Sequence, residues 1–281
     1  MAFTWSEVVY GARLIEQLRT KLVFGQIAGR VQYIGTPTRG GSVQILTPST
    51  ISTGSTADGA ISFTAVSGAA STITIGSYTT FDIELPLSSR QALSGEQEAM
   101  LVRNTLDEGA FAMAKDIDDS LAALKSSAEL DLGTFSDAID ATNAMEVLGI
   151  VRDTLENAGA LNRGGWVVFP SLFGSFLFEA LSVKPQLMDG KVLSDGLLTH
   201  YMGLDIYTSP ALTSTSDATP DEFEHTLFAG QYGSIAAAYG IDQLNYGPLW
   251  PSTRGRGMSG VVAYGVLAAK TDAMLAATIT K

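Results

Sequence analysis

The chain of 281 residues contains no cysteine. This absence excludes disulfide bonds, thiolate nucleophiles and cysteine-based zinc sites, and it is neutral about the cellular compartment. No apolar run approaches the roughly 20 residues that a membrane span requires, so we expect no membrane association. The first residues also lack a basic segment followed by an apolar one, so no signal peptide is predicted.

Charged residues are scarce as well, at 16% of the chain against 46% hydrophobic residues. This composition is too apolar for a disordered protein, and the length allows one elongated or two compact domains. The formal net charge is −12. Because a protein that binds DNA as a free monomer is normally basic, this charge argues against a sequence-reading DNA-binding protein.

The charge is distributed unevenly along the chain. Residues 1–40 hold five basic and two acidic side chains, and residues 251–281 hold four and one, so each end is +3 and the middle is −18. Basic ends on an acidic body suit head-to-tail contacts between identical subunits, with a merely solvated face as the alternative interpretation. The candidate inter-subunit contacts are the apolar anchor Trp5 and the basic residues Arg13, Arg19, Lys21, Arg39, Arg254 and Arg256.

Apolar residues recur at three- and four-residue steps over residues 6–24, which predicts an amphipathic helix. Three glycines then follow within about ten residues: Gly25, Gly29 and Gly35. We therefore expect this part of the chain to be an arm that lies on a neighbouring molecule and is not part of a core.

From residue 36 to residue 90 the chain is rich in serine, threonine and glycine. Period-two alternation marks strands around Val43, Ile73 and Phe81, and the small polar residues 47–60 predict a turn or loop tip. Together they predict a long two-stranded β excursion, which needs support from another surface because an isolated hairpin is barely stable.

The strongest local pattern is an apolar stripe at helical spacing between residues 91 and 125, which predicts a helix of roughly 50 Å. The stripe consists of Val102, Leu106, Ala110, Met113, Ile117, Leu121 and Leu124. We expect the other side of the helix to face solvent, because it carries Asp107, Glu108, Asp116, Asp118 and Asp119.

Downstream, a helix is predicted from residue 143 to 158, with Gly159 at its C-terminal cap. A continuous apolar strand follows from Trp166 to Pro170, and shorter strands are predicted at 204–207, 227–229 and 235–239. Residues 261–270 and 273–280 are expected to form a final strand pair. The expected fold class is α+β.

This order of elements resembles the major capsid proteins of tailed bacteriophages, which have the Hong Kong phage-type fold. Residues 164–170 resemble the family's step of apolar strand, proline and helix, and residues 202–209 resemble its step of glycine, strand and small polar residues. Residues 225–244 and 264–279 resemble its axial-domain and closing peripheral-domain strands. The resemblance covers essentially the whole chain.

The resemblance implies five parts: an N-terminal arm (1–35), an extended β loop (36–90), a peripheral domain with the spine helix (91–142), an axial domain that includes some peripheral-domain strands (143–250), and C-terminal strands of the peripheral domain (251–281). It implies a structural protein that self-assembles from hexamers and pentamers into an icosahedral head shell around double-stranded DNA. An encapsulin-like nanocompartment shell is the alternative, although encapsulins usually have a shorter β loop.

The partners implied by the resemblance are further copies of the chain, a portal protein, a cement or decoration protein, and packaged DNA in non-specific contact. A separate scaffolding protein is also expected, because the predicted arm helix begins within ten residues of Met1. Assembly is expected in the host cytoplasm and the final location is the virion.

Some relatives cross-link their subunits through a lysine of the β loop. Because no lysine occurs between Lys21 and Lys115, and the guanidinium of arginine is a poor nucleophile, we expect a shell without such cross-links.

Catalytic constellations are weak in this sequence. Neither Ser171 nor Ser209 lies in a G-x-S-x-G elbow, so a triad with His200 or His225 is not favoured. A metal site built from these histidines with Asp205 or Glu224 lacks the short ligand spacing of known sites. An enzyme of unfamiliar α/β type, and a surface adhesin suggested by residues 47–80, are further alternatives.

Two further patterns match functional motifs only by letter. The acidic residues Asp116, Asp118 and Asp119 are expected to be part of the solvated face of the long helix. The spacing Gly255-x-Gly257-x-x-Gly260 matches a dinucleotide fingerprint, but its context favours a flexible loop, since no βαβ unit can follow. We expect no enzymatic activity, no cofactor and no metal.

Overall fold

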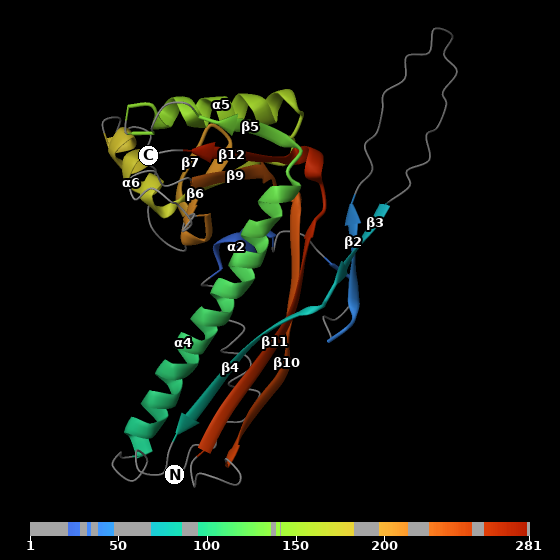
Figure 1. Cartoon of the computed structure of the whole chain (residues 1–281), viewed down its shortest axis with the longest axis vertical. Helices are drawn as coiled ribbons and strands as arrows, with labels where there is room; N and C mark the ends of the chain where they lie inside the picture. The colour runs from blue at the N-terminus through green and yellow to red at the C-terminus, as the bar shows by residue number, and fades with distance from the viewer. Residues whose placement is uncertain are drawn as a thin grey trace.

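The computed structural model describes residues 22–28, 33–34, 39–47, 69–85, 95–135, 139–140, 142–182, 197–212, 225–248 and 256–279. The molecule is elongated, with a compact lobe at one end and a long helix and long strands running away from it (Figure 1). These two parts are called the lobe and the shaft.

The shaft consists of α4 (Gly95–Ala122) lying along an antiparallel sheet of order β10-β11-β4. Its strands are β4 (Ser77–Leu85), β10 (Ile235–Pro248) and β11 (Arg256–Ala268). At 1.5 Å per residue, α4 is about 42 Å long. The predicted apolar stripe of the helix is confirmed, because the following residues are buried: Leu106, Ala110, Met113, Ile117 and Leu121.

The ring of Phe81 on β4 packs between helix and sheet where both present a glycine. A Cβ added at Gly109 of α4 would lie 3.0 Å from this ring, and one added at Gly260 of β11 would lie 2.2 Å from it. A close-packed core has no room for either methyl group without movement of the ring. The expected flexible loop around the glycine motif is therefore wrong for residues 256–260, which belong to β11.

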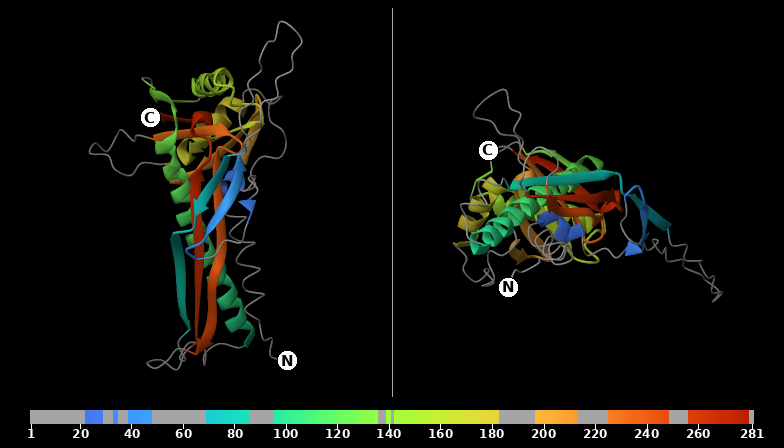
Figure 2. Two further views of the ribbon diagram at one scale, coloured as in Figure 1. Left: turned by 90° about the vertical axis from the view of Figure 1, so that its right-hand side faces the viewer. Right: turned by 90° about the horizontal axis from the view of Figure 1, so that it is seen from below.

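A hairpin lies across the lobe end of the shaft sheet (Figure 2). It pairs β2 (Ser42–Thr47) with β3 (Ala69–Thr74) and, on the other side, with β1 (Tyr33–Ile34). Its buried isoleucine and valine side chains pack against small residues of the shaft sheet, Ala236, Ala238 and Ala263. The hairpin thus gains from the shaft the support that two strands alone lack.

The predicted strands around Val43, Ile73 and Phe81 are confirmed. The expectation of one two-stranded excursion is wrong for residues 77–85, because β4 pairs with β11 of the shaft and not with the hairpin. Alternation of side chains predicts a strand but not its partner, which here is almost 180 residues away in sequence. The predicted tip lies outside the described residues after Thr47.

The lobe contains a six-stranded sheet of order β5-β12-β9-β6-β8-β7. Its strands are β5 (Leu130–Thr134), β6 (Gly165–Pro170), β7 (Leu197–Tyr201), β8 (Leu204–Ser209), β9 (His225–Gln231) and β12 (Met274–Ile279). The helices α5 (Ala144–Asn157) and α6 (Ser171–Ser182) belong to the same part (Figure 1). Short 3₁₀ turns connect the elements at Ala123–Ser127, Pro210–Leu212 and Thr271–Ala273.

The continuous apolar run of β6 is explained by its position in the sheet, because both faces of the sheet are covered at this strand. Val167 and Phe169 belong to the core formed with α5 and α6. Trp166 and Val168, which alternate with them, belong to the core shared with the shaft.

Helix α5 ends as the sequence predicts. Gly159 has a φ of 69°, the left-handed conformation that glycine adopts most easily. The N–H of Gly159 donates to the carbonyl of Glu156, and the N–H of Ala160 donates to that of Leu155. This is the Schellman arrangement, which satisfies two carbonyls at the end of the helix.

The C-terminal strands are present, but the expected pairing between them is wrong. β11 pairs with β10 and β4 in the shaft, whereas β12 pairs with β9 and β5 in the lobe. β5, from the segment predicted to be part of the peripheral domain, lies in the sheet of the lobe. The segments 91–142 and 251–281 thus each contribute to both parts of the molecule.

A short helix, α2 (Val23–Ala28), lies where the lobe meets the shaft (Figure 1). Phe24 and Ile27 are fully buried, as is Leu22 just before the helix. The expectation that all of 1–35 lies on a neighbour is therefore wrong for residues 22–28, which are part of the subunit's own core. Gly25 is closely packed within α2, since a Cβ at this position would lie only 2.5 Å from the Cβ of Leu22.

Candidate assembly surfaces

Most of the predicted inter-subunit contacts lie outside the described residues: Trp5, Arg13, Arg19, Lys21 and Arg254. Arg256 is the first residue of β11, where its backbone is paired with Pro248 and Leu85. Arg39 precedes β2, and 67% of its side chain is exposed. Its role between subunits stays a prediction.

Arg39 makes two contacts within its own subunit. Its guanidinium lies 3.9 Å from the carboxylate of Asp242 on β10 and 5.0 Å from the ring centroid of Tyr78 on β4. Ion pairs and cation–π contacts at such exposed places are individually weak. The contacts hold the start of the hairpin against the shaft and leave most of the side chain accessible.

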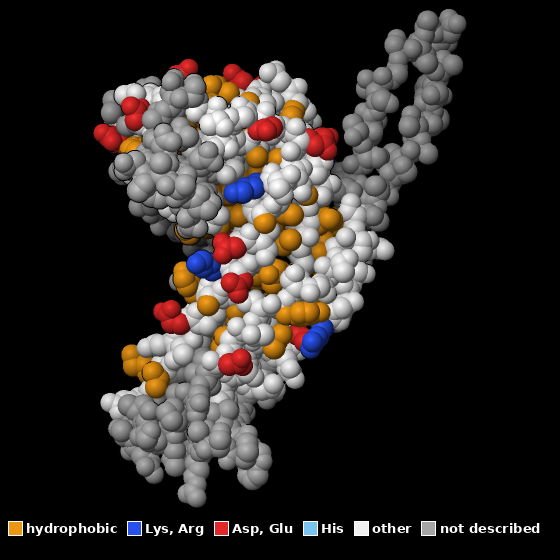
Figure 3. Space-filling view, in the orientation of Figure 1, with side chains coloured by type: hydrophobic (Ala, Val, Ile, Leu, Met, Phe, Trp, Pro, Cys, Tyr) orange, Lys and Arg blue, Asp and Glu red, His pale blue; other side chains and the backbone are white. Residues whose placement is uncertain are grey.

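The outer side of α4 exposes large apolar side chains near its beginning. Met100 is 65% exposed and Leu101 40% exposed, and Phe111 on the same helix is also exposed. Figure 3 shows hydrophobic side chains at the surface along this part of the shaft, among scattered acidic ones. Grouped apolar side chains at a surface are typical of contacts with another protein.

The expectation that all acidic residues of α4 face solvent is wrong for Asp118. Asp119 is exposed, but Asp118 is buried because α2 lies on this side of the helix. The Oδ2 atom of Asp118 accepts a hydrogen bond of 2.8 Å from the N–H of Val23, and its Oδ1 atom accepts one of 3.3 Å from Gly25. Asp116 accepts one of 2.6 Å from the hydroxyl of Thr79.

Burial raises the pKa of Asp118 to about 7, although the backbone N–H groups of Val23, Gly25 and Phe24 act in the opposite direction. The cause is the loss of water around the charged form, which outweighs these hydrogen bonds. Helical spacing places Asp118 at the edge of the apolar stripe, four residues after Ala114 and three before Leu121, whereas Asp119 lies on the opposite side. The segment that covers Asp118 is more than 90 residues away and could not be predicted from this spacing.

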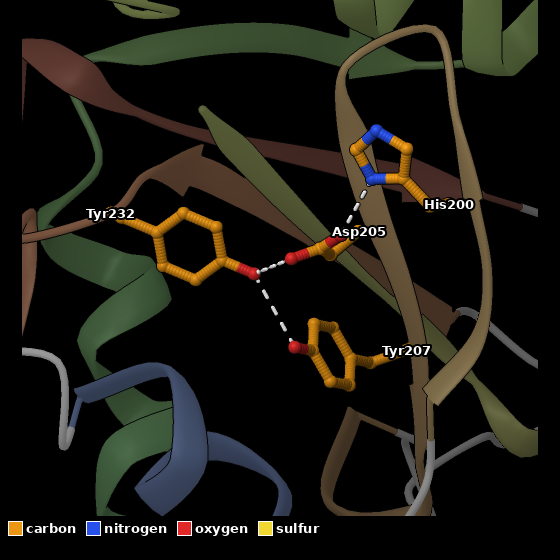
Figure 4. A network of polar contacts seen from close by, with 4 residues as sticks. All are labelled: His200, Asp205, Tyr207 and Tyr232. Atoms are coloured by element: carbon orange, nitrogen blue, oxygen red, sulfur yellow. Dashed lines mark hydrogen bonds and ion pairs between the residues drawn. The ribbon is translucent and has the colours of Figure 1, made fainter. Parts of the chain in front are cut away.

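A polar network joins β7, β8 and the turn after β9 (Figure 4). The Nδ1 atom of His200 lies 2.7 Å from Asp205, whose second oxygen accepts a hydrogen bond from the hydroxyl of Tyr232. The hydroxyls of Tyr232 and Tyr207 are 3.3 Å apart. Burial, together with the hydrogen bond to Asp205, raises the pKa of Tyr232.

The network does not form a catalytic triad. Ser209 lies four residues beyond Asp205 on β8, about 13 Å away along an extended strand. Its hydroxyl is buried and accepts a hydrogen bond from the N–H of Ala211. The geometry instead ties the edge strand β7 to the centre of the lobe.

The two histidines cannot share a metal ion. His200 is on β7 and His225 on β9, and β8 and β6 lie between these strands in the sheet. Because neighbouring strands are about 4.8 Å apart, the backbones of β7 and β9 are separated by about 14 Å. Among the described residues, no group of three or more potential ligands of this kind comes together. Nor does any described helix have the length and apolar character needed to cross a membrane.

No protein-family model matches the sequence, and no curated protein matches it either. Solved structures do match its fold. The capsid of cyanophage P-SCSP1u aligns with a TM-score of 0.60 and 13% identity, over 87% of this chain and 85% of that chain. The head structure of Helicobacter pylori bacteriophage KHP40 aligns with a TM-score of 0.59 and 11% identity, over 92% and 90%.

A virus-like particle from Pyrococcus furiosus aligns with a TM-score of 0.56 and 11% identity, over 95% of this chain and 97% of that chain. Identities this low bear on the fold alone. In each case the match spans lobe and shaft together, so the architecture as a whole is shared. The chain has the tailed-phage capsid fold.

Proposed function

We propose that this chain is the major capsid protein of a tailed phage, which self-assembles into the icosahedral head shell around the double-stranded DNA genome. The observation that carries the proposal is the reciprocal coverage. Phage capsid and head chains align over 87% and 92% of this chain and over nearly as much of their own length. The protein acts as building material and not as an enzyme.

The architecture supports an assembling subunit. The hairpin has no core of its own and depends on the shaft sheet for burial. The outer side of α4 exposes Met100 and Leu101. Surfaces of this kind are stabilised when a second copy covers them, so folding and assembly are coupled.

Within this proposal, residues 1–21 of the N-terminal arm and the tip of the β loop lie on neighbouring subunits in hexamers and pentamers. Trp5 and the basic residues Arg13, Arg19, Lys21, Arg39, Arg254 and Arg256 contact the acidic body of the next subunit. The further partners are a separate scaffolding protein, a portal protein, a cement protein and, non-specifically, the packaged DNA. Assembly takes place in the host cytoplasm, and the protein ends in the virion.

Sedimentation of the purified chain, alone and with a co-expressed scaffolding protein, tests the proposal, with negative-stain microscopy of the fast fraction. Closed shells are the expected product. Only monomers at every concentration and with any scaffold would overturn the proposal.

A substitution on α4 makes the test sharper. Met100→Glu should lower the assembled fraction on the order of tenfold, because it places a charge in an apolar contact, while Met100→Leu should assemble normally. Both variants should melt at the temperature of the unchanged subunit, since the side chain is exposed. If both variants assemble equally well, the exposed apolar surface of α4 does not take part in the shell contacts.

A nanocompartment shell of the encapsulin type is the second candidate. It is favoured by the alignment with the virus-like particle, which covers 95% of this chain. The content of particles from the natural source separates the two functions. Packaged double-stranded DNA supports the capsid, and a protein cargo without DNA supports the nanocompartment.

A further inference from the structure

Helix α2 joins the two parts of the molecule. The ring of Phe24 contacts Trp166 of β6 edge-on, with centroids 6.5 Å apart, and lies 6.0 Å from Phe228 of β9. On its other side α2 contacts α4, where the N–H groups of Val23 and Gly25 donate to Asp118. Six residues thus connect the sheet of the lobe to the helix of the shaft.

The apolar and polar parts of this connection differ in one respect. The ring contacts do not depend on pH, whereas the carboxyl group of Asp118 can bind a proton. α2 covers this carboxyl group, so undocking of α2 from α4 would expose the carboxyl group to water. Docking of α2 and protonation of Asp118 are therefore linked.

Among the described residues, few other groups that titrate lie around Asp118. α2 has no titratable side chain, and neither has the Pro210–Leu212 turn that packs on α4. On α4 itself, Asp119 is the one charged group that acts on Asp118, and Lys115 and Asp116 are exposed.

The strands around this junction contribute mainly tyrosines, Tyr207 on β8, Tyr239 on β10 and Tyr264 on β11, and tyrosine is generally neutral between pH 6 and 8. Asp205 and Asp242 are held by other partners, His200 with Tyr232 and Arg39 respectively. The remaining titratable groups on these elements are Tyr78, Asp82 and Glu84 of β4, Tyr246 of β10 and Arg256 of β11. Lys125, in the turn after α4, donates a hydrogen bond to Thr226. Among the described residues, Asp118 is thus the group whose protonation bears directly on the contact with α2.

We propose that α2 and Asp118 form a proton-linked lock, which holds the lobe against the shaft more tightly when the Asp118 carboxyl group is protonated. This inference concerns the single subunit and does not rest on the proposed function. In a shell, the lock would determine how freely the lobe can turn on the shaft in differently curved positions.

The direction and size of the effect follow from linkage. With α2 docked, the pKa of Asp118 is about 7, and the ordinary value of 3.8 returns when water reaches the carboxylate. A folded-state pKa above the unfolded one means that the stabilisation is complete below pH 3.8 and is lost as pH rises through 7. Between pH 6 and pH 8, the equilibrium constant for docking should fall about tenfold.

Hydrogen exchange of the full-length, unassembled chain tests the linkage. After correction for intrinsic rates, protection of the amides in 22–28 should be about tenfold higher at pH 6 than at pH 8. Asp118→Asn, which cannot titrate, should show no such change, and the matched control Asp119→Asn should behave like the wild type. A pH-independent wild type, or an Asp118→Asn variant with the wild-type slope, would overturn the proposal.

A direct titration covers the case in which Asp118→Asn does not fold. The ¹³C shift of the Asp118 carboxyl group in the wild-type chain should have its midpoint near pH 7, and a midpoint near 4 would contradict the lock.

The mechanical part is tested separately, because the absence of cysteine allows two spin labels to be placed without background. Glu108→Cys on α4 and Asp153→Cys on α5 report the distance between shaft and lobe. Phe24→Ala in this background raises the population of the undocked state. The distance distribution should then be broader at pH 8 than at pH 6. If the two distributions are equal while the pH-dependent protection of 22–28 is still present in this background, α2 does not hold the lobe.

Discussion

The lobe and the shaft bury their sheets in different ways. In the lobe, α5 and α6 cover one face of the six-stranded sheet and form a core of their own, while the other face packs on the shaft. In the shaft, one helix covers a three-stranded sheet, and its core is completed by Trp166 and Phe228 from the lobe. The shaft is thus the part whose core depends on another surface, that of the lobe.

Trp166→Ala should produce the largest effect, because Trp166 lies in the core shared by both parts. The side chain contacts Phe24 and Phe228, and its indole N–H donates to the carbonyl of Gln231 at 3.0 Å. The free energy of unfolding should fall by about 3–5 kcal/mol. Chemical denaturation followed by both circular dichroism and fluorescence should give one transition. Two separate transitions in the wild type would mean that lobe and shaft unfold independently.

A pair of glycine substitutions compares the two parts directly. Gly260→Ala in the shaft places a Cβ 2.2 Å from the ring of Phe81 and should lower the free energy of unfolding by about 1–3 kcal/mol. Gly149→Ala on α5 of the lobe meets no atom within 4 Å and should raise it by about 0.5–1 kcal/mol. Denaturation midpoints that shift equally for both variants would contradict the packing described for Phe81.

Arg39→Ala should have a smaller effect on the subunit, at most about 1 kcal/mol, because its ion pair with Asp242 is exposed and 3.9 Å long. The effect should decrease with added salt, since exposed charges are screened. Melting curves at low and high ionic strength measure it. A large loss of stability that is independent of salt would show that Arg39 acts through packing.

No covalent multimers are expected to survive boiling in denaturant, because the extended β loop has no lysine for a covalent link. Mature particles should give a single band near 29.6 kDa on a denaturing gel. A ladder of multimers that survives boiling would establish a covalent link between the shafts or arms of neighbouring subunits.

Local patterns in the sequence were sufficient for most of the elements. The helical stripe through Leu106, Met113 and Ile117 predicted α4, and Gly159 predicted the end of α5. The continuous apolar run from Trp166 to Pro170 predicted a strand. In each case residues within a few turns or one strand determine the conformation, because helical and extended backbones repeat every 3.6 and 2 residues.

Pairing and burial across long separations were decided only by the tertiary structure. β4 and β11 have the same alternation as hairpin strands, yet they are partners across the chain. Asp118 and Asp119 are adjacent aspartates on one helix, and the position of α2 covers the first while the second stays exposed. The sequence by itself determined the elements of this protein and their order. Their partners, and the surroundings of each charge, were determined only when distant segments came together, because a residue's own pattern carries no information about what covers it.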